Sequence, residues 1–183
     1  MPAGRARVCW RVAGVIGALV LAAALQYQAD IMTAVHNAWG DHDLTAWIAA
    51  IGETESRFEP MARSHTNAKG CYQFTTIAWV EVGRLDPRLK GFNRWDCRQS
   101  LRAAVVLLKS YRKQFYRQAA CKQHQSATMA YNRGPGAVRK YQRIYGERWA
   151  ANADPEGRAY LPKVLRLERG YIAAGWLGIS VCG

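Results

Sequence analysis

Residues 51–73 read IGETESRFEPMARSHTNAKGCYQ, and the carboxylate of Glu55 is the group in this stretch that points to chemistry. A helix beginning near Asp43, a residue type that caps helix N-termini, would extend through Glu55. Helical spacing puts Glu55 on the same face as Leu44, Trp47, Ile48, Ile51 and Phe58. Burial among apolar side chains disfavours the charged form of a carboxyl group and raises its pKa. The stretch therefore predicts a general acid that is protonated near neutral pH.

The neighbouring acid Glu53 lies two residues earlier, about 200° around the same helix. We therefore expect Glu53 to face away from the apolar side and to be a solvated charge. An alternative for Glu55 is that it lies at a frayed helix end and caps a nearby backbone amide.

Three more segments follow Glu55-Ser56-Arg57-Phe58 in order, and they are Gly70-Cys71-Tyr72-Gln73, Ala130-Tyr131-Asn132-Arg133-Gly134 and Tyr160 ahead of Val164-Leu165. Pro60, Ala62 and Ser64 complete the first segment. Together these segments resemble the soluble-lytic-transglycosylase (SLT) branch of the lysozyme superfamily, enzymes that cut bacterial cell-wall glycan with one carboxylic acid. The resemblance implies an all-α, lysozyme-like domain over roughly Asp41 to Gly175.

The resemblance also implies a role for each matching residue. Glu55 would protonate the glycosidic oxygen and then accept the proton of the 6-hydroxyl of N-acetylmuramic acid, which gives a 1,6-anhydro product without water or cofactor. Tyr160 would position the acid. The expected substrate-binding residues are Ser56, Gln73, Tyr131 and Asn132. No aspartate after Asp43 forms a recognisable partner motif with Glu55.

Two departures from the family pattern affect the expected cleft. Cys71-Tyr72 replaces the usual Leu-Met, which changes the lining and leaves the subsite preference open. Arg133 replaces the common small residue after the asparagine. Its cation would either attract peptide-stem carboxylates or point outward.

The N-terminus differs in kind from the rest of the chain. Arg5, Arg7 and Arg11 precede an uncharged run from Val12 to Leu25 that ends in an Ala-x-Ala pattern at Ala22–Ala24. This arrangement is typical of a signal peptide, and an uncleaved membrane anchor is the alternative. We expect residues 1–29 to be this segment and residues 30–183 to be a single enzyme domain in the periplasm or cell envelope, with membrane contact only through an uncleaved N-terminus.

Four cysteines follow the N-terminal segment: Cys71, Cys97, Cys121 and Cys182. An even number in an exported chain indicates disulfides, and four cysteines allow three pairings. We favour Cys71–Cys97 and Cys121–Cys182, with buried free thiols as the alternative. The histidines are scattered, and the sequence predicts no metal site.

The net charge of +13 favours a polyanionic partner. Peptidoglycan carries peptide carboxylates and lies beside anionic polymers. Nucleic acid is not expected, because no zinc-finger, RNA-binding or leucine-zipper pattern is present. Solubility of a secreted domain is a sufficient alternative explanation of the charge.

Further helices are expected over residues 73–82, from Asp96 to about 115, over 127–132 with Ser126 as cap, over 137–145, and from about 157 to 174 with Pro162 in or near the first turn. Asp96 and Gln99 form a capping-box-like start, and Leu101, Val105, Leu108 and Phe115 supply the buried stripe. The chain has no internal repeat and no β alternation.

These features predict a peptidoglycan lytic transglycosylase that opens the wall locally, for secretion, conjugation, pilus assembly or phage entry. A secretion or conjugation machine spanning the envelope would then be a partner. A hydrolytic lysozyme on the same fold is the nearest alternative. A non-catalytic peptidoglycan-binding protein comes next, and a basic nucleic-acid-binding protein is more distant.

Overall fold

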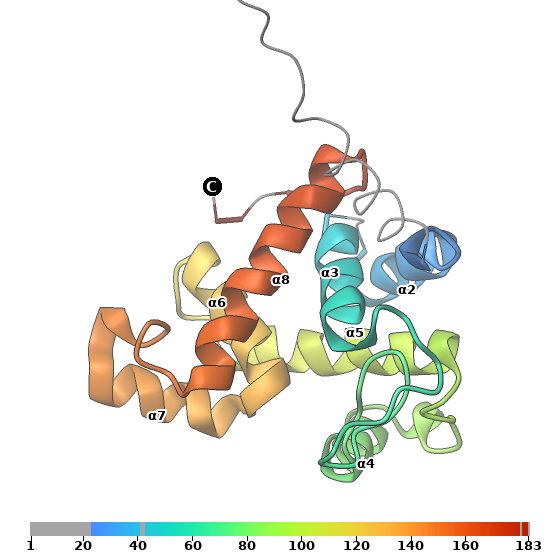
Figure 1. Ribbon diagram of the computed structural model, residues 1–183, viewed down its shortest axis with the longest axis horizontal. Coiled ribbons are helices and arrows are strands. Elements are labelled where there is room, and N and C mark those ends of the chain that lie inside the picture. Colours follow the sequence, from blue (N-terminus) through green and yellow to red (C-terminus); the bar gives the residue numbers. More distant parts are fainter. Residues whose placement is uncertain (1–22, 41–42, 180, 183) are drawn as a thin grey trace, which may run out of the picture.

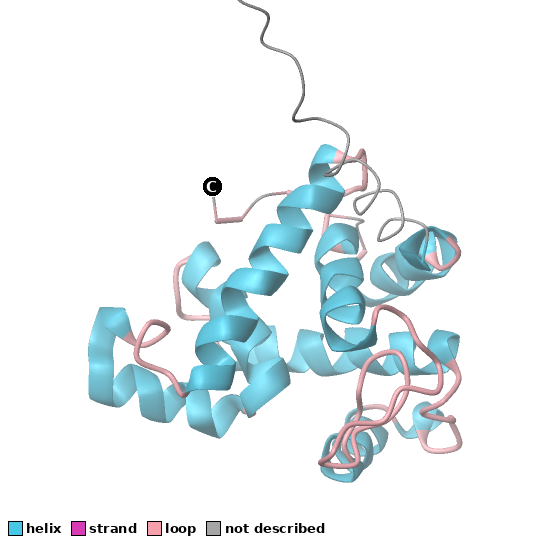
Figure 2. Ribbon diagram, viewed as in Figure 1, coloured by secondary structure: helices cyan, strands magenta, loops and turns pink. Residues whose placement is uncertain are grey.

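The structure is a computed structural model that describes residues 23–40, 43–179 and 181–182. The described chain forms helices and loops with two isolated β-bridges and no strand, which confirms the predicted all-α class (Figures 1 and 2). The α-helices are α2 (Gln28–Trp39), α3 (Thr45–Ser56), α4 (Thr76–Leu85), α5 (Cys97–Gln114), α6 (Ala120–Arg133), α7 (Pro135–Tyr145) and α8 (Pro155–Ala173). Two short 3-10 helices lie over Pro87–Leu89 and Gly146–Arg148.

Helix α3 is the centre of the fold. It packs against α8, α2 and α5, and every residue from Thr45 to Glu53 is buried (Figure 1). Leu44 occupies the N-cap position without a side-chain hydrogen bond, so the helix begins one residue later than a cap at Asp43 would place it. The helix ends at Ser56, and the backbone then passes through two positive φ angles, 57° at Arg57 and 61° at Phe58. This sharp turn leaves Glu55 in the last turn of α3, just after the buried residues Thr45 to Glu53.

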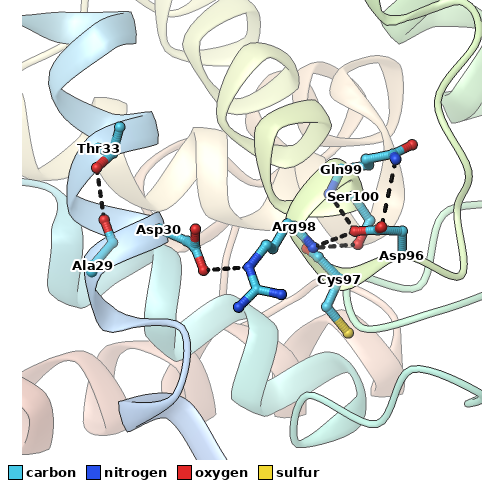
Figure 3. A network of polar contacts seen from close by, with 8 residues as sticks. All are labelled: Ala29, Asp30, Thr33, Asp96, Cys97, Arg98, Gln99 and Ser100. Carbon is cyan, nitrogen blue, oxygen red and sulfur yellow. Dashed lines mark hydrogen bonds and ion pairs between the residues drawn. The ribbon is translucent and has the colours of Figure 1, made fainter.

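Helix α5 begins as the sequence predicts. The Asp96 carboxylate accepts hydrogen bonds from the backbone amides of Arg98 (2.9 Å) and Gln99 (3.0 Å), as Figure 3 shows. The Gln99 side chain caps the amide of Asn93 (2.7 Å) rather than that of Asp96. Arg98 donates to Asp30 of α2 at 2.8 Å, so the start of α5 is joined to α2 (Figure 3).

Several boundaries differ from the sequence prediction. The sequence patterns did not predict α2. The helix expected over residues 73–82 begins at Thr76, capped by Thr75, so Gln73 lies in the preceding turn. Helix α6 begins at Ala120, and the cap expected at Ser126 is wrong. The Ser126 hydroxyl donates to Gln118 (2.7 Å) in mid-helix instead of capping a helix end.

The last helix begins earlier than expected. Asp154 caps α8 by accepting from the amide of Gly157 at 3.2 Å, and Pro155 occupies the first turn. Pro162 therefore lies inside α8 rather than in its first turn. A proline there cannot donate a backbone hydrogen bond to the preceding turn, so the local helix depends on packing against α3.

The two favoured disulfides are both present. Cys71 pairs with Cys97 at a Cα–Cα separation of 5.3 Å, and Cys121 pairs with Cys182 at 4.9 Å. The first joins the loop after α3 to the start of α5, and the second joins the start of α6 to the C-terminal tail. Both separations lie in the range that disulfide geometry requires.

The predicted signal peptide or anchor falls mainly on residues 1–22, outside the described residues. Ala24 is buried in the core, and Tyr27 stacks on Phe58 with ring centroids 5.5 Å apart. Within the described part of the chain, no helix combines the length and the apolar character needed to cross a membrane.

Candidate active site

A cleft of about 690 Å³ opens beside the C-terminal end of α3. Its lining residues come from the loop after α3, from α4 and α5, and from α6 and the start of α8. Lining residues from the predicted set are Glu55, Gln73, Tyr131 and Asn132. Residues far apart in the sequence thus meet around one carboxyl group.

Glu55 is partly exposed to the cleft and otherwise enclosed by protein. The Tyr160 hydroxyl of α8 donates a hydrogen bond of 2.6 Å to Glu55 Oε1. Burial raises the pKa of Glu55 to about 7, although the Tyr160 hydrogen bond and the Lys163 charge lower it. The burial effect wins because water solvates the carboxylate poorly at this position. A carboxyl group with this pKa can donate a proton near neutral pH and take it back.

Gln73 and Tyr131 are fixed in the cleft by backbone contacts. Gln73 has a φ of 46°, and its side-chain amide donates to the carbonyls of Ala62 (3.0 Å) and Gly70 (2.9 Å). Tyr131 donates from its hydroxyl to the carbonyl of Tyr72 at 2.8 Å. Burial and the nearby Glu55 charge raise the pKa of the Tyr131 phenol, so it remains a neutral donor.

Asn132 and Ser56 both bond to protein groups, although Asn132 Oδ1 is buried without a hydrogen-bond partner. The Asn132 amide donates to Glu156 Oε1 at 3.1 Å. The Ser56 hydroxyl donates to the carbonyl of Cys71 at 2.8 Å and accepts from the amide of Glu59 at 3.1 Å, and Ser56 does not line the cleft. Its expected contact with the sugar stays a prediction.

Known proteins resemble this chain in sequence and in fold. The sequence model of the "Transglycosylase SLT domain" family matches residues 33–153, from within α2 to the loop just before α8. The chain belongs to this family. A curated relative, membrane-bound lytic murein transglycosylase F of Desulfosudis oleivorans, is 34% identical over 123 residues, which cover 67% of this chain and 25% of the relative.

Solved structures show the same fold as this SLT-domain chain. The 70 kDa soluble lytic transglycosylase SLT70 of Escherichia coli superposes with a TM-score of 0.66 at 19% identity, covering 82% of this chain. An inactive mutant of lytic transglycosylase Slt of Pseudomonas aeruginosa gives 0.65 at 23% identity over 85% of this chain. The SLT-domain chain spans about a quarter of the length of each of these relatives.

The expectation for Glu53 in the SLT domain is wrong. Glu53 is 4% exposed rather than solvated, and its Oε2 has no hydrogen-bond partner. Burial raises the pKa of Glu53, while Arg57 and Lys163 lower it. Helix α3 is enclosed on all sides, so the face opposite Glu55 is also buried.

The SLT-domain cleft contains acids that the sequence prediction missed. Glu81 of α4 and Glu156 of α8 both line it, and the charge of Glu156 helps to raise the pKa of Glu55. Glu156 follows Asp154-Pro155 at the start of α8, where acids commonly stabilise a helix N-terminus. That local role is the only signal in the sequence, and it gives no hint of the cleft.

Arg133 is held between acids. It forms ion pairs with Asp154 (Nε to Oδ2, 3.0 Å) and Glu156 (Nη1 to Oε2, 2.8 Å). Its charge is thereby offset locally, so capture of peptide-stem carboxylates would have to compete with two acids already in contact.

Within residues 23–40, 43–179 and 181–182, no three His, Cys, Asp or Glu side chains are grouped so that they could hold a metal ion.

Proposed function

We propose that this chain is a peptidoglycan lytic transglycosylase with Glu55 as its general acid and base. The observation that carries the proposal is a carboxyl group with a pKa of about 7, open to a 690 Å³ cleft and hydrogen-bonded to Tyr160. The SLT family and the curated relative named as a lytic murein transglycosylase support it.

The proposed reaction needs one proton and no water. Protonated Glu55 transfers its proton to the oxygen that links N-acetylmuramic acid to N-acetylglucosamine, and the bond from that oxygen to C1 of the muramic acid breaks. The 6-hydroxyl of the same muramic acid then attacks C1 as Glu55, now a carboxylate, takes the hydroxyl proton. The products are a free 4-hydroxyl and a 1,6-anhydro end, and Glu55 is protonated again.

Neighbouring residues would support both steps. The Tyr160 hydroxyl holds Glu55 Oε1, and its donated hydrogen bond strengthens as Glu55 loses its proton. Lys163 contributes a positive charge nearby and donates to the carbonyl of Thr54 at 3.1 Å. Gln73 keeps its side-chain oxygen for sugar hydroxyl or amide groups, because its NH₂ group is bound to backbone carbonyls.

A hydrolytic lysozyme reaction is the second candidate, because the cleft holds further carboxylates that could activate water. Glu81 and Glu156 share the cleft with Glu55, and an inverting hydrolase uses a second carboxylate to activate water. Glu156 is engaged with Asn132 and Arg133, which opposes such a role for it.

The deciding experiment is digestion of purified sacculi followed by mass measurement of the muropeptides. The transglycosylase product is lighter than the hydrolytic product by one water and has no reducing end, so borohydride does not label it. A reducible, full-mass muramic acid as the main initial product would assign the protein to the lysozymes. Binding to sacculi without any product would instead favour the non-catalytic glycan-binding role.

We further propose that the protein works in the periplasm or cell envelope, where disulfides form and persist. The two cysteine pairs and the net charge of +13 support this location next to an anionic wall. Local opening of the wall for a secretion, conjugation or pilus machine, or for phage entry, belongs to the same proposal. Cross-linking in cells that carry such a machine, followed by mass spectrometry, would identify the partner.

A further inference from the structure

Arg133, the last residue of α6, joins three helices at one end of the cleft. Its ion pairs reach Asp154 and Glu156 at the start of α8. Asp154 in turn accepts from the hydroxyl of Tyr141 on α7 and from the amide of Gly157. The side chains of Arg133 and Asp154 are 30% and 26% exposed and that of Glu156 is 64% exposed, so the pair with Asp154 is the better shielded from water.

Glu156 links this cluster to the reacting carboxyl group. One oxygen accepts from Arg133 Nη1 at 2.8 Å, and the other accepts from the Asn132 amide at 3.1 Å. Glu156 and Glu55 line the same cleft. The planar guanidinium reaches Asp154 through Nε and Glu156 through Nη1, so it joins the two acids, while Asn132 holds the second oxygen of Glu156.

We propose that Arg133 is a positioning residue of this cleft: it anchors Glu156 against Asn132 and offsets the Glu156 charge that acts on Glu55. The kinetic part rests on the proposed function, whereas the electrostatic part concerns the folded protein alone. Without Arg133, Glu156 would keep its charge, lose one of its two anchors and leave the Asn132 amide less fixed.

Several groups act on Glu55, and the proposal concerns one of them. Helix α8 presents Tyr160, Lys163 and Glu156, and α6 presents Tyr131. His65 and Glu81 lie on the facing walls of the cleft. Removing the Arg133 charge leaves the acids beside it less neutralised, which favours the protonated form of Glu55. Removing the Glu156 charge has the opposite effect.

The direction in which the Glu55 pKa moves in each variant distinguishes this role from a purely structural one. If Arg133 only held the helices together, its loss would admit water to Glu55 and bring the pKa of Glu55 down from about 7. The positioning role instead predicts that the pKa of Glu55 increases in Arg133→Ala and decreases in Glu156→Gln.

The experiment measures two quantities in the full chain. The pKa of Glu55 is followed by carbon NMR of labelled glutamate carboxyl groups, assigned by the signal missing in Glu55→Gln. Sacculus digestion gives kcat/KM. We expect Arg133→Ala to lower kcat/KM about tenfold. Arg133→Lys should restore the Glu55 pKa but only part of the rate, since an ammonium lacks the two-pronged geometry.

Arg143→Ala is the matched control, since it removes the same charge from an exposed position on α7. It should leave both quantities unchanged. A lower Glu55 pKa in Arg133→Ala, or an unchanged pKa and rate, would overturn the proposal. If Arg133→Ala does not fold, the proposal is tested with Arg133→Lys and Glu156→Gln. A Glu55 pKa that does not fall in Glu156→Gln would overturn the proposal. Failure of the wild-type protein to digest sacculi would count against the proposed function and leave the NMR result valid.

Discussion

The raised pKa of Glu55 predicts that replacing the acid stabilises the protein at high pH. Between its ordinary value of 4.5 and the folded value of about 7, the native protein binds a proton that the unfolded chain releases. The free energy of unfolding therefore falls as pH rises through this window. The full difference corresponds to about 3 kcal/mol above pH 7, and partial exposure of Glu55 reduces it to about 2 kcal/mol.

Glu55→Gln keeps the shape of the protonated acid and an acceptor for Tyr160, and it removes the titration. Urea unfolding at pH 4 and pH 8, with disulfides intact, should show no difference from wild type at pH 4. At pH 8 the variant should be about 2 kcal/mol more stable. Sacculus digestion should meanwhile fall by about two to four orders of magnitude.

Glu59→Gln is the control, because Glu59 is exposed and glutamine can still accept from the amide of Met61. It should follow the wild type at both pH values. Equal stability of Glu55→Gln and wild type at pH 8, together with normal folding, would show that Glu55 is not held in a desolvated site and would refute the reasoning.

Tyr160→Phe removes the 2.6 Å hydrogen bond to Glu55, so sacculus digestion should slow about ten- to a hundredfold. The upper limb of the pH–rate profile should also move up by about one pH unit, because that hydrogen bond lowers the pKa of Glu55. Replacing the exposed Tyr145 by Phe should change neither quantity. Glu53→Gln should change digestion less than about threefold, because Glu53 does not line the cleft; a loss matching Glu55→Gln would mean that the acid is misassigned. The intact mass after alkylation without reductant should show no modified cysteine beyond residue 22, and alkylation after reduction should modify four. A freely alkylated Cys71 in the oxidised protein would contradict the Cys71–Cys97 disulfide.

Short motifs in the sequence predicted several of the residues that the structure brings together around Glu55. Helical periodicity placed Glu55 on a desolvated face, and the family resemblance assigned Tyr160 as the residue that positions it, over a separation of 105 residues. Periodicity failed for Glu53 because it assumes that a helix has one solvated face. Helix α3 has none, so the same spacing that located the acid gave the wrong surroundings for its neighbour.

Local signals also failed where a side chain had two possible partners. Ser126 has the chemistry of a helix cap, yet it lies inside α6, six residues after the helix begins. Its hydroxyl donates to Gln118, which precedes the helix. Glu156 has the chemistry of an acid in a first helical turn. Its contacts with Asn132 and Arg133 depend on how α6 meets α8, which no local pattern contains.

Glu53 and Glu55 show together why a raised pKa does not identify a catalytic acid. Both lie on α3, and desolvation raises the pKa of both. Glu53 is 4% exposed, lies outside the cleft and has an oxygen without a hydrogen-bond partner, so no substrate oxygen can reach it. Glu55 opens to a cleft and is oriented by Tyr160. Desolvation makes a carboxyl group able to hold a proton at neutral pH, whereas access and a fixed orientation are what allow it to deliver that proton to a substrate.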